Sequence, residues 1–395
     1  MRLLTAYARS ETISGMGAQG EVVQTIDVIV VGAGPGGAAT ALAALREQPG
    51  ASVLILDRSP LGRDKVCGDG LGADAVDELT GLGLTDLLRR DERVPALRLV
   101  TPSRNWQGMT PEPGYVVPRA EFDARLMAAA LAAGAVFEHH TVRQVHWDRD
   151  GVLVDGKFRA RVLVGADGAN STVRRALGAA QNRGRDMAVA IRGYAPAPAG
   201  FKELHIRWDP VPGNGLSYAW AFPTARGTVN VGYGTAAPER SKARMAARAA
   251  ELLPGFAVES AQLRGHRLPL ASCRPPPAHG RVLLVGDAAS LVNPLTGEGI
   301  FYALASGALA GRAAVQAEPA RTYSQELRRR LGAHHRQVRL LACLVDRPRI
   351  VSAAVAASAR NERTFMRLVS AGLGAGRLSA IDLLRVAADT LVPRF

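Results

Sequence analysis

The chain has 395 residues, 47% of them hydrophobic and 21% charged. This composition is typical of a globular protein of two or three domains and excludes a mainly disordered or coiled-coil chain. The formal net charge is +14, but the arginines are scattered rather than gathered into a basic stripe, so we expect no nucleic-acid partner. Three cysteines without CxxC spacing argue against a disulfide framework and favour a cytoplasmic protein.

The first segments in chain order predict a strand, a glycine-rich turn, a helix and a second strand. Residues 1–24 are expected to form a loose tail. Residues 24–31 (QTIDVIVV) and 52–57 (SVLILD) are short apolar runs typical of buried parallel strands. Residues 38–47 between them favour a helix. This order predicts a βαβ unit at the start of an α/β fold.

The later segments predict a second sheet and a helical C-terminal part. Residues 91–118 and 186–270 carry the turn-forming and aromatic residues of antiparallel strands, whereas residues 119–134 indicate a helix. Residues 281–287 (RVLLVGD) read as another buried strand. From Arg321 onward the pattern is helical almost to the end.

The turn after the first strand has the spacing Gly32-x-Gly34-x-x-Gly37, and Asp57 ends the next strand. Glycines at these positions let backbone amides approach a pyrophosphate at a helix N-terminus, and the acid can accept hydrogen bonds from a ribose. Asp57 argues against the 2′-phosphate of NADP. The alternative, a tight turn that binds nothing, is disfavoured because strand, helix and acid all stand in the expected order.

Two later segments favour FAD over NAD. Asp167-Gly168 and Gly286-Asp287 each follow a buried strand, and Asp287 is placed to bond the ribityl hydroxyls of a flavin. The amides of residues 297–300 begin a helix and can face a phosphate or the flavin O2, where negative charge develops on reduction. No second GxGxxG follows an expected strand, so the sequence predicts one dinucleotide cradle, filled by FAD.

With six motifs in this order, the chain resembles the geranylgeranyl reductase family of FAD-dependent oxidoreductases, which has the para-hydroxybenzoate hydroxylase fold. The resemblance covers about residues 24–310. It implies an α/β protein with a Rossmann-like FAD-binding domain, an inserted antiparallel-sheet substrate domain and a helical C-terminal region. The motifs are GAGPGG (32–37), KVCGDG (65–70), VVPRAEFD (116–123), GADGANSTVR (165–174), YAWAFP (218–223) and GDAASLVNPLTGEGI (286–300).

The resemblance also implies domain limits and cofactor contacts. The glycine loop would hold the pyrophosphate, Asp57 the adenosine ribose, Arg119 the ribityl or phosphate region and Val142 the adenine side. The expected limits are residues 25–90, 119–180 and 280–315 for the FAD-binding domain, 91–118 and 181–279 for the substrate domain, and 316–395 for the helical region. The implied cofactor-binding residues are Gly32, Gly34, Gly36, Gly37, Asp57, Arg58, Cys67, Gly68, Gly70, Arg119, Val142, Asp287, Gly297, Gly299 and Ile300.

YAWAFP, followed after eight residues by Gly232-x-Gly234, resembles the substrate-cavity signature of that family. Tyr218, Trp220 and Phe222 alternate along an expected strand, so their side chains point to one face. Reduction of an isolated alkene needs a proton source and dry walls. Protonation leaves cation character, which an aromatic face stabilises by about 1–2 kcal/mol. We therefore expect the three rings to line a groove for a prenyl chain, with ordinary core packing as the alternative.

Two residues are candidates for the proton source. Cys67 lies in a glycine-rich turn beside Lys65, which we expect to lower the pKa of the thiol; a cysteine that only fills space is the alternative. Tyr218 is the second candidate donor. His139-His140 and His334-His335 are adjacent pairs with no acid or cysteine at ligand spacing, so we expect no metal site.

These features predict an FAD-dependent reductase of C=C bonds in a geranylgeranyl-type chain on an isoprenoid lipid, a quinone or a terpenoid. NADPH or ferredoxin is the expected reductant. The alternatives are an FAD-dependent monooxygenase or halogenase on a secondary metabolite, and a flavoprotein that only binds or delivers a lipid. Ser290 stands where many hydroxylases carry His, and YAWAFP differs from the Trp-x-Trp-x-Ile-Pro of halogenases, so the reductase is favoured.

A peripheral membrane contact is also considered. Residues 321–345 place the apolar residues Leu327, Leu331, Val338, Leu341 and Val345 among many arginines. That pattern fits a helix on a membrane surface or, more simply, the solvated face of an ordinary helix.

Overall fold

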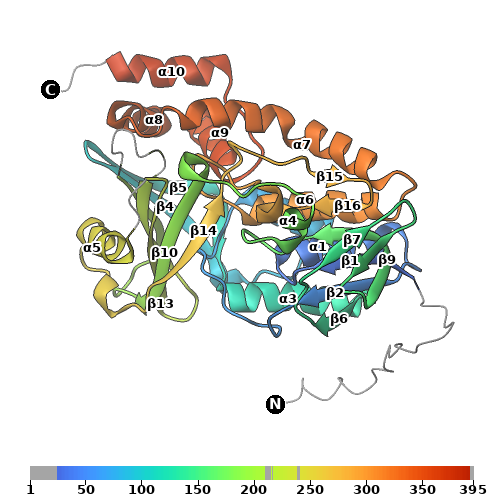
Figure 1. The fold of residues 1–395 in the computed structure, drawn as a ribbon. Helices are drawn as coiled ribbons and strands as arrows, with labels where there is room; N and C mark the ends of the chain where they lie inside the picture. The colour runs from blue at the N-terminus through green and yellow to red at the C-terminus, as the bar shows by residue number, and fades with distance from the viewer. Residues whose placement is uncertain (1–24, 210–214, 216, 238–240, 392–395) are drawn as a thin grey trace, which may run out of the picture.

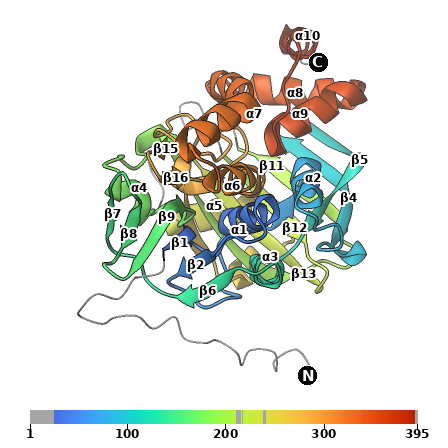
Figure 2. The ribbon, with the colours of Figure 1, turned by 90° about the vertical axis from the view of Figure 1, so that its right-hand side faces the viewer.

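The computed structural model describes residues 25–209, 215, 217–237 and 241–391, so the expected tail of residues 1–24 lies outside the described residues. A mainly parallel sheet and a mainly antiparallel sheet lie side by side, and helices of the C-terminal part run across one side of both (Figures 1 and 2). The predicted fold class is confirmed: a Rossmann-like domain, an antiparallel domain and a helical C-terminal region.

The parallel sheet is built from the strands that the sequence predicts as buried. Its order is β15-β16-β9-β1-β2-β6, with β1 (Ile26–Val31) between β2 (Val53–Asp57) and β9 (Phe158–Gly165). All five residues of β2 are buried, as expected when a parallel sheet is covered on both faces. The other strands are β6 (Val136–His139), β7 (Val145–Trp147), β8 (Val152–Val154), β15 (Ala278–His279) and β16 (Val282–Leu284).

Two glycines bring α1 (Pro35–Glu47) and α6 (Ile300–Ala314) into close contact. A Cβ on Gly307 would lie 2.4 Å from the Gly36 carbonyl oxygen, and one on Gly311 would lie 2.2 Å from that of Thr40. Side chains at these positions would force the helices apart, so the Gly-x-x-x-Gly spacing permits the packing. Gly36, in the first turn of α1, therefore lies against Ala303 and Gly307 in the first turns of α6.

The antiparallel sheet contains the strands expected in residues 91–118 and 186–270. Its order is β14-β10-β13-β12-β11-β4-β5-β3, and only β11 and β4 pair in parallel among its described strands. The bounds are β3 (Gly70–Leu71), β4 (Arg93–Thr101), β5 (Arg104–Val116), β10 (Met187–Pro196), β11 (Glu203–Trp208), β12 (Ser217–Pro223), β13 (Thr228–Thr235) and β14 (Arg264–Pro269).

The C-terminal part is helical, as predicted, but three of the five apolar residues considered for a membrane-surface helix are buried, while Leu341 and Val345 are half-buried. Leu327, Leu331 and Val338 of α7 are buried because α7 packs on α6 and the edge of the parallel sheet. The arginines of α7 remain on the outside. The helices are α2 (Ala73–Gly81), α3 (Arg119–Ala132), α4 (Thr172–Ala176), α5 (Lys242–Leu252), α7 (Pro319–Ala342), α8 (Pro348–Arg360), α9 (Glu362–Leu373) and α10 (Ala380–Leu391).

Candidate active site

The glycine loop between β1 and α1 has two glycines that the turn requires and one that leaves room for a ligand. Gly32 has φ of +113°, and a Cβ on Gly37 would lie 1.8 Å from the Gly32 carbonyl oxygen. These two positions close the turn. At Gly34 the nearest protein atom to an added Cβ is 3.8 Å away, at the Arg63 guanidinium. The open space at Gly34 fits the close approach of a pyrophosphate to the backbone.

Asp57 is held beside this loop at the end of β2. Its Oδ2 accepts a hydrogen bond from the amide of Ala33, and its Oδ1 accepts one from the amide of Ser59, both at 2.8 Å. The Arg63 guanidinium lies 3.8 Å from Oδ2. The carboxylate is therefore oriented at the carboxyl edge of the parallel sheet, where an adenosine ribose binds in folds of this kind.

Asp287 follows β16 and lies at the inner end of the site. Its Oδ2 is 3.2 Å from Lys65 Nζ and 3.8 Å from His266 Nε2. Burial alone would raise the pKa of Asp287, but the Lys65 ammonium holds it well below the ordinary value of 3.8. Asp287 is thus an anion, ready to accept hydrogen bonds from ligand hydroxyl groups.

We expect Lys65→Gln to weaken the folded state and to shift acid unfolding to higher pH. The depressed pKa of Asp287 contributes stability above the ordinary carboxyl pKa, and this contribution is lost as the pH falls below that value. Without the ammonium the loss begins at a higher pH, and the cost at pH 7 is about 1–3 kcal/mol. Urea unfolding and acid titration followed by circular dichroism measure both effects.

Lys157→Gln is the matched control for Lys65→Gln. Lys157 pairs with Glu138 at 2.8 Å, but both side chains are exposed, so the expected cost is below about 1 kcal/mol. Equal effects of the two substitutions would contradict the assigned role of Lys65.

A large apolar cavity of about 1250 Å³ joins the cofactor loops to the second sheet and to the C-terminal helices. One end lies against the loops that carry the predicted flavin contacts. Apolar side chains of the C-terminal part, such as Val345, Val355 and Leu373, line the cavity as well. The predicted cofactor-binding residues that line this cavity are Cys67, Gly68, Gly70, Arg119, Asp287, Gly297, Gly299 and Ile300.

The three aromatic residues of β12 all line this cavity, as their alternation predicts. Trp220 is buried, while Tyr218 and Phe222 are partly buried. A Cβ on Gly68 or on Gly70 would lie 3.4 Å from the Phe222 ring. The aromatic face of β12 is thus in direct contact with the loop that carries Cys67.

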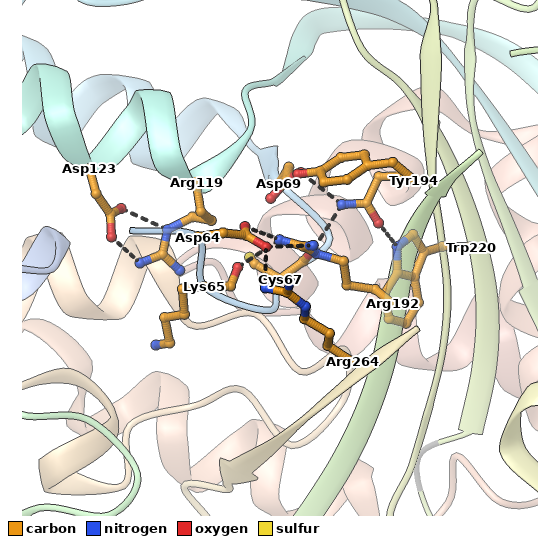
Figure 3. A network of polar contacts seen from close by, with 11 residues as sticks. Asp64, Lys65, Cys67, Asp69, Arg119, Asp123, Arg192, Tyr194, Trp220 and Arg264 are labelled. Atoms are coloured by element: carbon orange, nitrogen blue, oxygen red, sulfur yellow. Dashed lines mark hydrogen bonds and ion pairs between the residues drawn. The ribbon is translucent and has the colours of Figure 1, made fainter. Parts of the chain in front are cut away.

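Cys67 lies where the sequence places it, but the expected effect of Lys65 on it is wrong. Lys65 pairs with Asp287 instead. Burial raises the pKa of the Cys67 thiol, and the nearby positive charge that opposes this effect is Arg119. Arg119 is itself buried and bonded to Asp123 at 2.7 and 2.8 Å (Figure 3). Cys67 therefore carries its proton near neutral pH. This suits a proton donor, whereas a nucleophilic cysteine would react as the thiolate.

Tyr218, the second candidate donor, has its hydroxyl proton engaged. The hydroxyl donates a hydrogen bond to the carbonyl oxygen of Thr296 in the loop before α6. Burial also raises the pKa of Tyr218 above its ordinary value. It is therefore the weaker of the two candidate acids, and its bond to the loop favours a role in shaping the cavity.

Seven predicted cofactor contacts do not line the large cavity: the four of the glycine loop and Asp57, described above, together with Arg58 and Val142. Val142 is buried in the core after β6, and Arg58 is exposed, with its carbonyl oxygen bonded to His139 at 2.8 Å. Both follow strands at the Asp57 end of the parallel sheet. Their roles at the adenosine end of FAD stay predictions.

Sequence reasoning missed three polar residues near the site. Glu298, within the recognised TGEG segment, lines the cavity, and burial raises its pKa to about 7. His266 of β14 also lines it, and its Nε2 is buried with no hydrogen-bond partner among the described residues. Asn230 of β13 is fully buried between the aromatic strand and the Cys67 loop. Glu298 could have been found from its motif, whereas the other two depend on contacts between distant segments.

Comparison with known proteins agrees with this geometry. The family model described as "FAD binding domain" matches residues 25–307. The menaquinone reductase of Mycobacterium tuberculosis is 35% identical over 359 residues, which cover 84% of this chain and 86% of the relative. Digeranylgeranylglycerophospholipid reductase 1 of Methanopyrus kandleri is 34% identical over 74% of this chain and 80% of its own.

A solved structure shows the same fold. The geranylgeranyl bacteriochlorophyll reductase-like protein of Thermoplasma acidophilum superposes with a TM-score of 0.76 at 21% identity, covering 93% of this chain and 96% of its own. The residues of the site, the matched domain and the relatives together confirm the resemblance read from the motifs. The chain belongs to the FAD-binding-domain family, within the group of flavoproteins that contains the menaquinone and geranylgeranyl-lipid reductases.

Proposed function

We propose that this protein is an FAD-dependent reductase that saturates C=C bonds in the prenyl chain of an isoprenoid quinone or lipid. The observation that supports the proposal is the apolar cavity, whose lining includes predicted flavin contacts, the Cys67 thiol, the aromatic side chains of β12 and apolar residues of the C-terminal helices. Relatives named for menaquinone and for geranylgeranyl lipids support this substrate class.

The residues of the chain would divide the chemistry as follows. When bound and reduced, FAD supplies a hydride equivalent. The Cys67 thiol holds the proton that adds to the less substituted alkene carbon. The Trp220 face stabilises the cation character that develops at the neighbouring carbon. The apolar walls exclude water, which would otherwise trap that cation.

Binding of the substrate would rest on its hydrocarbon chain. Each buried CH₂ group contributes about 0.8 kcal/mol, and the walls toward the C-terminal helices are mostly aliphatic, with side chains such as Leu341, Ile350 and Leu368. A long prenyl chain therefore supplies much of its own binding energy. The number of reducible double bonds would depend on how far the chain enters.

We further propose that the reductant, NADPH or a protein donor such as ferredoxin, binds only transiently. The sequence contains a single GxGxxG that follows a strand, and the cradle around it fits FAD. Stopped-flow reduction of the bound FAD by each donor in turn would identify the reductant.

A peripheral membrane contact through α10, which lines part of the cavity, would suit a prenyl-lipid or prenyl-quinone substrate. Ile381 and Leu384 of α10 are 60% and 69% exposed, while Leu383 and Val386 of the same helix line the cavity. Arginines of α7, among them Arg339, are also exposed, and α10 itself packs on α8. None of the described helices has the length and hydropathy of a membrane span.

We expect Leu384→Glu to lower binding to vesicles of anionic phospholipid by about three- to tenfold. The substitution replaces an apolar side chain by a negative charge, which the negatively charged lipid surface repels. Vesicle co-sedimentation measures the effect. Val136→Glu, at a site that is 49% exposed on β6 at the opposite side of the molecule, is the control and should bind as the unaltered protein does. Equal losses would contradict this surface.

The direct test of the function is anaerobic. Holoenzyme reduced with dithionite is incubated separately with menaquinone and with geranylgeranyl diphosphate. The extracted products are re-oxidised in air, which returns any quinol to the quinone, and are then analysed by mass spectrometry. A gain of two hydrogen atoms per reduced bond supports the reductase. Product that forms only in air and gains an oxygen atom would support the monooxygenase instead. Retention of FAD without turnover of either substrate would favour a binding protein.

A further inference from the structure

A buried amide links the Cys67 loop to the aromatic strand. Asn230 on β13 is fully buried. Its Nδ2 donates to the carbonyl oxygen of Cys67 at 2.9 Å and to Oδ2 of Asp69 at 2.7 Å, and its Oδ1 accepts the indole N–H of Trp220 at 2.9 Å. Both amide hydrogens and the amide oxygen are therefore engaged, and the amide can satisfy these partners in one orientation only.

The Trp220 ring has little freedom in this arrangement. A Cβ on Gly232 would lie 2.2 Å from the ring, and one on Gly68 would lie 3.5 Å from its Nε1. The indole is therefore packed between β13 and the Cys67 loop. The bond to Asn230 fixes the direction of the indole N–H within that space, and the ring presents its remaining surface to the cavity.

The Cys67 loop is held on the same side by polar groups. The Cys67 carbonyl oxygen also accepts Nε of Arg192 at 3.1 Å. Asp69 has a positive φ of 64°, an unfavourable conformation for a residue other than glycine. Its carboxylate is bonded to the Tyr194 hydroxyl as well as to Asn230 (Figure 3). The loop thus owes its shape to contacts from β10 and β13, outside the glycine-rich turn itself.

We propose that Asn230 is a positioning residue that fixes the Cys67 thiol relative to the face of Trp220, so that proton donation and cation stabilisation act on the same double bond. This inference rests on the proposed function, because it assigns a geometric task to two groups of that mechanism. It goes further by giving the task to a residue that does not line the cavity.

Asn230→Asp tests the contacts of this side chain to the Cys67 loop separately from its contact to Trp220. Aspartate has nearly the shape of asparagine and can still accept the Trp220 N–H. When ionised it cannot donate to the Cys67 carbonyl, and its carboxylate repels that of Asp69, so the contacts to the loop are lost while the contact to Trp220 can remain. Thr235→Val is the matched control. Thr235 is a buried residue on the same strand, its hydroxyl bonds Ser217 of β12 at 2.8 Å, and it does not line the cavity.

The test compares the holoenzymes of the unaltered protein, Asn230→Asp and Thr235→Val. For each we measure steady-state kinetics per bound FAD, the FAD dissociation constant and the rate of Cys67 alkylation by iodoacetamide. Alkylation is followed on the Cys67 peptide by mass spectrometry. For Asn230→Asp we expect kcat to fall by about 10- to 100-fold, as misplacement of about 1 Å can produce. KM and FAD affinity should change less than about threefold, and Cys67 should alkylate faster. Thr235→Val should match the unaltered protein in kcat and alkylation.

Three outcomes would overturn the inference: an unchanged kcat, a loss that only follows FAD content, or an equal loss in Thr235→Val. If the unaltered holoenzyme reduces no prenyl substrate, the proposed function fails, and alkylation then decides the inference by itself. An unchanged alkylation rate of Cys67 in Asn230→Asp would show that the amide does not position the loop.

Discussion

Cys67→Ala is expected to retain FAD and to lose most alkene reduction, with kcat lower by about 10²- to 10⁴-fold, the usual contribution of a positioned acid. The substitution removes the one cavity-lining thiol among the described residues and leaves the loop backbone, held by Arg192 and Asn230, intact. Anaerobic single-turnover assays with product mass spectrometry measure the loss, and the flavin absorbance spectrum confirms that the cofactor is present.

Two comparisons make the result specific. Cys273→Ala and Cys343→Ala change exposed cysteines and should leave turnover within about twofold, since exposed positions seldom affect structure. Cys67→Ser keeps a polar hydrogen, but a hydroxyl is a much weaker acid than a thiol, so it should restore only part of the rate. Undiminished turnover in Cys67→Ala would remove Cys67 from the mechanism and leave Tyr218 or Glu298 as the acid.

Gly34→Ala is expected to fold normally and to lose FAD affinity by 100-fold or more, about 3 kcal/mol. The backbone at Gly34 is extended, with φ of −88°, and an added Cβ meets no protein atom closer than 3.8 Å. The methyl group would instead occupy the space in which the pyrophosphate approaches the amides. Isothermal titration of the apoprotein with FAD, together with its melting temperature, separates binding from folding.

Substitutions at two other glycines serve as controls for this prediction. Gly50→Ala, where an added Cβ has no neighbour within 4 Å, should change neither property. Gly37→Ala would place its Cβ 1.8 Å from the Gly32 carbonyl oxygen and should destabilise the apoprotein itself. If Gly34→Ala bound FAD as tightly as Gly50→Ala, the cofactor would not lie on this loop.

The sequence was sufficient to predict the parts of the fold that local pattern determines. The buried runs that became β1 and β2, the glycine turn and the acid at Asp57 follow from spacing and hydrophobicity alone. The alternation of Tyr218, Trp220 and Phe222 was likewise enough to place three rings on one wall of a cavity, because successive side chains of a strand point to opposite faces.

Contacts between distant segments could not be read in the same way. Lys65 was expected to act on Cys67, two residues away, but its partner is Asp287, which lies 222 positions along the chain. Asn230 has no unusual signal in its local sequence, since its importance comes from Cys67, Asp69 and Trp220 on other segments. The apolar residues of α7 correctly predicted a helix, but they did not show what its apolar side packs against. Periodicity alone does not distinguish a protein core from a bilayer.

The close approach of α1 and α6 has a consequence for biosynthesis. Gly307 touches the backbone of Gly36, so the cofactor loop acquires its final neighbour only after the ribosome has made most of the chain. Contacts of such large sequence separation form late, because a long loop must close first. The cofactor loop is therefore fully enclosed only after synthesis has passed Gly307, so we expect stable retention of FAD to begin late in the synthesis of the chain.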